Sequence, residues 1–135
     1  MRIGIDVRCL QDGTHSGVEE YAQSLLEEIF AQDTKNEYIL FANTWNTSRV
    51  DFSWVTVYPN VTVRLSRWPN KLLNFCFWYL GWPKVDRMLG GMDVFFMPNL
   101  NFIALSRDVR FVLTAHDLSF ELFPETFSWK RRLWH

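Results

Sequence analysis

The chain has 135 residues, the size of a single domain, with 14 basic and 15 acidic residues. This nearly balanced charge argues against a nucleic-acid-binding protein, and 48% hydrophobic residues argue against disorder. The N-terminus lacks a signal-peptide pattern and no apolar run reaches membrane-spanning length, so we expect a cytoplasmic location. Cys9 and Cys76 have neither metal-ligand nor redox-pair spacing, and we expect free thiols.

The first elements predict a parallel sheet. Residues 2–7 form a short apolar run typical of a buried strand, and residues 37–42 form a second one. Between them, apolar residues recur every three or four positions from Val18 to Phe30, which predicts an amphipathic helix. Ser16 and Glu19 have the spacing of a capping box at its start. Strand, glycine-containing turn, helix and strand in this order make a βαβ unit.

The rest of the chain extends this pattern. Residues 61–65, 93–97 and 110–115 predict three more strands, and residues 70–90 predict helix interrupted at Pro83. A last helix is expected to begin near Ser128. We therefore predict a Rossmann-like, doubly wound parallel α/β sheet with its first strand central and its fourth and fifth beside it. Such sheets commonly have about six strands, so we expect residues 1–135 to be an incomplete domain whose open edge favours self-association.

Ligands of open parallel sheets bind outside the carboxyl ends of the strands, which nominates residues 8–18, 98–103 and 116–127. In the first loop, the backbone near Gly17 could bind a phosphate at the helix N-terminus, but a well-capped helix explains the same residues. Glu19 and Glu20 would repel a phosphate there. His116 and Asp117 follow the predicted fifth strand, where histidine can move protons or donate hydrogen bonds, or else fill a structural role.

Residues 75–82 (FCFWYLGW) are strongly aromatic and are flanked by Arg67, Lys71, Lys84 and Arg87. This pattern fits an interfacial helix in peripheral contact with the inner membrane face, or a helix packed between the sheet and a second domain. We favour the packed helix because the basic residues are few and lie on several faces. Residues 130–132 (KRR) indicate a solvated helix face, with anion binding as the alternative.

Four motifs together resemble family-4 glycosyltransferases of the GT-B fold: MRIGIDVRCL, SGVEEY, DVFFMPN and TAHDLSFELFPETFSWKRRLW. The resemblance implies an N-terminal, acceptor-side domain over residues 1–135, with the C-terminal donor-binding domain absent from them. It implies hexose transfer from a nucleotide sugar to a glycan or lipid-linked acceptor, with retained anomeric configuration and neither metal nor other cofactor. Residues 1–135 alone would be inactive as a transferase.

The resemblance also implies roles for single residues. His116 would lie near the transferred sugar, and Gly17 would belong to the loop that approaches the donor's diphosphate. With them we group Asp117, Asn99 and Asn101 as substrate- or donor-binding candidates. The family often has a further glycine and an arginine where this chain has Glu19 and Glu20. A non-catalytic α/β domain that binds a small molecule or another protein remains the alternative.

Overall fold

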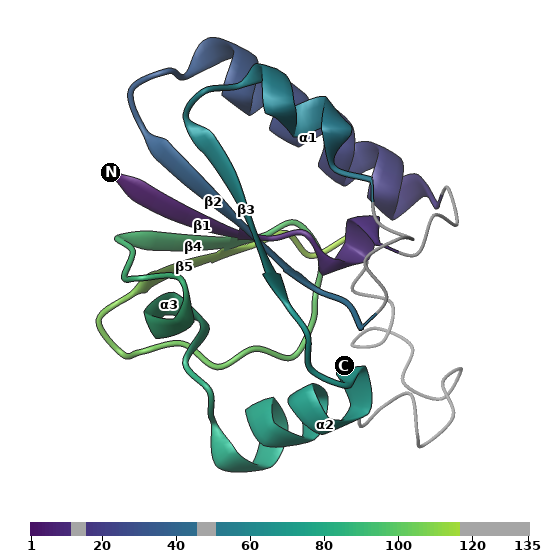
Figure 1. Ribbon diagram of the computed structural model, residues 1–135, viewed down its shortest axis with the longest axis vertical. Coiled ribbons are helices and arrows are strands. Elements are labelled where there is room, and N and C mark those ends of the chain that lie inside the picture. The colour runs from purple at the N-terminus through teal and green to yellow at the C-terminus, as the bar shows by residue number, and fades with distance from the viewer. Residues whose placement is uncertain (12–15, 46–50, 117–135) are drawn as a thin grey trace.

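The computed structural model describes residues 1–11, 16–45 and 51–116 (Figure 1). They form one parallel sheet of five strands in the order β3-β2-β1-β4-β5. The strands are β1 (Arg2–Asp6), β2 (Glu37–Asn43), β3 (Val61–Ser66), β4 (Val94–Met97) and β5 (Arg110–Leu113). All five predicted strands are present, and β1 is central with β4 and β5 on one side. The α/β class and the Rossmann-like parallel sheet are therefore confirmed.

The helices cover the sheet from both sides. Helix α1 (Gly17–Gln32) lies on one face, and α2 (Asn70–Phe75) and α3 (Val85–Met88) lie on the other (Figure 1). Helix α2 continues as a single wide π-helical segment, η4 (Cys76–Leu80). Two short 3-10 segments, η1 (Arg8–Leu10) and η3 (Ser53–Val57), complete the described elements. The predicted helix near Ser128 and the basic residues 130–132 lie outside the described residues.

The start of α1 follows the predicted capping box. The Ser16 hydroxyl accepts a hydrogen bond from the Glu19 backbone N–H at 3.3 Å, and the Glu19 carboxylate accepts one from the Ser16 backbone N–H at 3.0 Å. Two of the N–H groups that every helix leaves unpaired at its start are thereby satisfied.

Each face of the sheet has its own apolar core, because side chains of a strand alternate between the faces. Strand β2 shows this most clearly, since Leu40 packs in the cluster under α1 while Phe41 packs in the cluster under α2 and α3. In the strand register, Ile5 of β1 pairs with Leu40 of β2 on one side and with Phe96 of β4 on the other. Burial on both faces explains why β2 is a continuous apolar run.

The predicted interruption at Pro83 is confirmed. Segment η4 ends at Gly81, whose φ of 56° lies in the left-handed region that favours glycine at helix ends. The bond between Trp82 and Pro83 is cis, and α3 starts at Val85.

The prediction that the aromatic segment packs as core is correct for one side only. Leu73, Cys76 and Phe77 are buried against the sheet. Six other side chains of this region remain exposed: Leu72, Phe75, Trp78, Tyr79, Leu80 and Trp82. The wide turn of η4 changes the angular spacing of residues from that of an α-helix, so the apolar side chains spread around the segment.

Strand β5 lies at one end of the described sheet and exposes its apolar side chains Phe111, Val112 and Leu113. Self-association through this edge stays a prediction. Within residues 1–11, 16–45 and 51–116, no helix has the length and apolar character that a bilayer span requires.

Candidate functional site

The carboxyl ends of the five parallel strands define one edge of the sheet, which we call the carboxyl edge. A buried ion pair lies where β1 ends. Arg8 Nη2 lies 2.6 Å from Asp6 Oδ2, Arg8 Nε lies 2.8 Å from Asp6 Oδ1, and the two side chains are only 8% and 3% exposed. The Arg8 guanidinium also lies 5.4 Å from the centre of the Phe41 ring and 5.6 Å from that of Phe77.

This ion pair connects two loops of the carboxyl edge. Arg8 Nη2 donates a second hydrogen bond, of 2.7 Å, to the carbonyl oxygen of Phe102, in the loop that follows β4. The Asp6 carboxylate in turn accepts a bond from the Arg8 backbone N–H. Because their charges satisfy each other, Asp6 and Arg8 position the loops after β1 and β4 and are not available to bind a charged ligand.

Asn43 has the same role at the end of β2. Its side chain is buried, donates to the carbonyl oxygen of Trp68 at 3.0 Å and to Asn70 Oδ1 at 2.6 Å, and accepts from the Trp68 backbone N–H at 3.1 Å. Its backbone N–H donates to Gln11 Oε1. One amide therefore fixes the loop after β3 to the end of β2.

Two polar atoms near this edge are buried without a hydrogen-bond partner among the described residues: Gln11 Nε2 and Ser66 Oγ. Buried polar groups are normally paired, so these two atoms are exceptions within the described part of the chain. The neighbouring Cys9 is a poor nucleophile, because burial, and next the charge of Asp6, raise the pKa of its thiol to about 12.

His116 lies at the same edge, just beyond β5. Its Nε2 lies 2.7 Å from the carbonyl oxygen of Pro98, which can only accept, so Nε2 carries the proton. The Tyr21 ring of α1 meets the imidazole edge-to-face, with the ring centres 5.0 Å apart and the planes at 88°. The residue is exposed, so the structure fixes its ring from two sides without burying it. Within the described part of the chain Nδ1 has no hydrogen-bond partner, so it is the ring nitrogen that remains for a ligand.

The structure brings some of the other predicted site residues near His116. Asn99 directly follows the carbonyl that His116 contacts, and Gly17 begins the helix that carries Tyr21. Asn101 instead bonds its own loop, because its Oδ1 accepts from the Phe102 backbone N–H. Asp117 lies outside the described residues. The binding roles of all four stay predictions.

Gly17 is not required by the fold. It lacks a left-handed φ, and a Cβ added there would meet no atom of the described residues within 4 Å. Glycine near a helix start weakens the helix relative to alanine, so its presence is compatible with a ligand that approaches the backbone closely.

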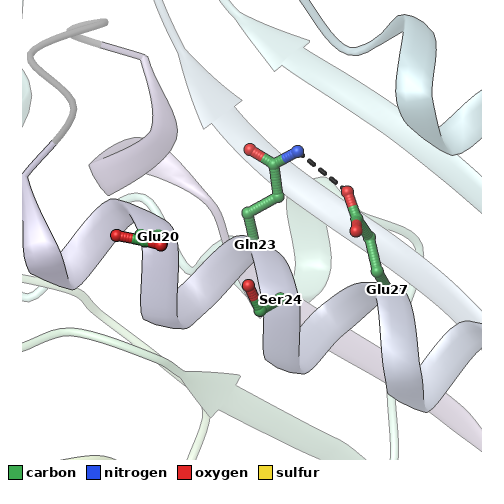
Figure 2. A pocket seen from close by; sticks show the side chains of 4 residues that line it. All are labelled: Glu20, Gln23, Ser24 and Glu27. Carbon is green, nitrogen blue, oxygen red and sulfur yellow. Dashed lines mark hydrogen bonds between the residues drawn. The ribbon is translucent and has the colours of Figure 1, made fainter.

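A groove on α1 lies elsewhere. It has a volume of about 450 Å³ and is lined by four residues of α1: Glu20, Gln23, Ser24 and Glu27. Figure 2 shows these side chains along one side of the helix, with Gln23 Nε2 donating to Glu27 Oε1 at 2.8 Å. The described lining carries two carboxylates and offers no feature that attracts a phosphate, and ligands of open parallel sheets bind at the carboxyl ends of the strands, so we place the candidate site at the carboxyl edge.

The sequence interpretation missed the Asp6–Arg8 pair and the Asn43 amide. Arg8 and Asn43 directly follow the strands predicted over residues 2–7 and 37–42, and a charged or amide residue at the end of a buried strand could have indicated them. Across the described ranges 1–11, 16–45 and 51–116, histidine, cysteine and carboxylate side chains form no group of three that could hold a metal ion.

Comparison with known proteins adds no assignment. No protein-family model, curated protein or solved structure matches the chain.

Proposed function

We propose that the chain is the acceptor-side domain of a retaining glycosyltransferase of the GT-B fold. In the complete enzyme, a hexose passes from a nucleotide sugar to a glycan or lipid-linked acceptor. The observation that carries this proposal is His116, which is exposed at the carboxyl edge and held by the Pro98 carbonyl and the Tyr21 ring. The motifs quoted from the sequence, the last of which contains this histidine, support the same assignment.

The geometry suits His116 for contact with a sugar. The bond from Nε2 to Pro98 fixes the imidazole, so Nδ1 keeps one orientation. A neutral ring accepts a hydrogen bond from a sugar hydroxyl at Nδ1, and a charged ring donates one to a hydroxyl oxygen.

The acidic residues in the first turn of α1 indicate that another domain mainly binds the donor's diphosphate. It carries Glu19 and Glu20, and the Glu19 carboxylate is already bonded in the capping box. Negative charge at this helix start offsets the helix dipole that would attract a phosphate. The contribution of Gly17 is then at most to let the diphosphate come close to the backbone.

A transfer assay tests the proposal. The protein expressed from its complete gene is incubated with labelled UDP- and GDP-hexoses and glycolipid acceptors, and we expect hexose in the product with the anomeric configuration of the donor. Calorimetry on residues 1–135 alone should show weak binding of nucleotide sugars or none. Micromolar binding by these residues, without transfer by the complete protein, would instead favour a non-catalytic small-molecule-binding domain.

A further inference from the structure

Helix α2, η4 and the residues just after η4 carry several exposed apolar side chains, although these elements are packed on the sheet. The exposed fraction reaches 69% for Tyr79 and 64% for Leu80. We call this surface the aromatic face and define it by Leu72, Phe75, Trp78, Tyr79, Leu80 and Trp82. Figure 1 shows α2 at the periphery of the molecule, on the side of the sheet away from α1.

The rings of the aromatic face are held in place. Phe75 and Tyr79 lie with their ring centres 4.8 Å apart, and Trp78 meets Phe102 edge-to-face at 4.7 Å. Trp82 meets Trp68 in the same way at 5.9 Å. On the inner side, Leu73, Cys76 and Phe77 fix the segment to the core. The outer apolar side chains are therefore exposed on an anchored element.

The charged residues in the sequence around this face have one sign. Between Asp51 and Asp86 the sequence contains no acidic residue, and it contains four basic ones: Arg64, Arg67, Lys71 and Lys84. Arg64, Arg67 and Lys71 are exposed. Lys84 Nζ lies 3.8 Å from the position that a Cβ on Gly81 would occupy, at the end of η4. A chain with a net charge of −1 thus has a run of basic residues in the same part of the sequence as these exposed aromatic side chains.

We propose that the aromatic face binds the surface of an anionic lipid bilayer, with α2 and η4 lying in the interface. Tryptophan and tyrosine favour the headgroup region, because their rings are apolar and their N–H and O–H groups stay hydrated. Basic side chains at the border of such a face contact anionic headgroups and place their apolar stems against the bilayer. A second copy of the chain is a poorer occupant, because a two-fold contact would bring these like charges together.

This inference is independent of the proposed transferase function. It concerns a surface formed by α2, η4 and the residues beside them, and it uses neither His116 nor the Asp6–Arg8 pair. The test therefore measures binding alone and needs no substrate.

Vesicle sedimentation tests the proposal with the full chain. The vesicles contain phosphatidylcholine alone or phosphatidylcholine mixed with phosphatidylglycerol. We expect sedimentation with the anionic vesicles, weakened by added salt. Replacing Tyr79 and Leu80 by serine should lower the partition coefficient about tenfold or more, because two exposed apolar side chains no longer enter the interface. Lys71→Glu should lower it about tenfold through charge alone.

Two matched controls lie away from the aromatic face. Val57→Ser removes an apolar side chain that is 73% exposed on η3, and Lys35→Glu reverses an exposed charge in the turn before β2. Both should bind vesicles like the unchanged protein. Thermal melting checks that every variant folds, and Lys71→Glu keeps the test decisive if the double serine variant does not.

Three results would overturn the proposal. The first is absence of sedimentation with anionic vesicles, and the second is equal binding by the Lys71→Glu and Lys35→Glu variants. The third is a dimer in analytical ultracentrifugation that the Tyr79 and Leu80 substitutions dissociate, since a second copy would then cover this face.

Discussion

Arg8→Met tests whether the buried ion pair holds the carboxyl edge together. Methionine keeps an unbranched apolar side chain between the Phe41 and Phe77 rings but removes the charge. Among the described residues, the Asp6 carboxylate, 3% exposed, would keep only its bond from the backbone N–H of residue 8, and the bond from Arg8 to the Phe102 carbonyl would be lost. Removing one member of a buried pair costs about 3–5 kcal/mol. A small domain is stable by about 5–15 kcal/mol, so a large share of its stability would be lost.

Urea unfolding followed by circular dichroism measures this cost. With a slope of about 1.5 kcal/mol per M, the midpoint should fall by about 2–3 M. Glu37→Gln is the control, because it removes the partner of Arg2 in an ion pair whose side chains are 40% and 50% exposed, and it should cost less than about 1 kcal/mol. Replacing Asp6 by leucine together with Arg8→Met should recover part of the loss, because no unpaired charge remains.

The reasoning would be refuted if Arg8→Met and Glu37→Gln lowered the free energy of unfolding equally. It would also be refuted if the double variant were less stable than Arg8→Met alone. Either result would mean that the pair does not position the loops after β1 and β4.

Three further predictions concern single side chains. Ser16→Ala should cost about 1 kcal/mol in urea unfolding by removing the capping box, and an unchanged midpoint would contradict this. Hydrogen bonds from Asn36 and Tyr38 hold the pKa of Asp33 well below its ordinary value of 3.8. These bonds therefore stabilise the folded state fully above pH 3.8, and the stabilisation is lost as the pH falls below that value. Melting temperatures between about pH 5 and pH 2 should therefore fall less steeply for Asp33→Asn than for the unchanged protein. Cys9, whose pKa is raised to about 12, should react with Ellman's reagent at pH 8 far more slowly in the folded protein than in urea; equal rates would contradict its burial.

The sequence predicts the strands and α1 because their signals are local. A strand buried on both faces, such as β2, needs a continuous apolar run, and the α1 start needs a capping residue at Ser16. The order of the strands follows from the right-handed connections of a parallel sheet, so β1 could be placed at the centre before any side chain was located.

The contacts at the carboxyl edge join residues that are far apart in the sequence, so local sequence patterns do not predict them. The Arg8 bond to Phe102 joins residues 94 positions apart, and it forms only because β1 and β4 are neighbours. The sequence also could not divide the aromatic segment into its buried and exposed sides. The wide turn of η4 departs from α-helical spacing, so a helical wheel assigns Trp78 and Tyr79 no definite side.

The central claim is that sugar transfer occurs at the carboxyl edge, beside His116. Turnover of labelled hexose by the protein from its complete gene, compared for His116→Ala and Gln23→Ala, tests it most directly. His116→Ala should lower turnover about a hundredfold or more with an unchanged urea midpoint, because the exposed imidazole is a positioned polar group and not part of the core. Gln23→Ala, in the groove on the outer side of α1, should leave turnover unchanged. If turnover by His116→Ala stayed within about twofold of that of the unchanged protein, or if Gln23→Ala caused the larger loss, the carboxyl edge would not be the site of transfer.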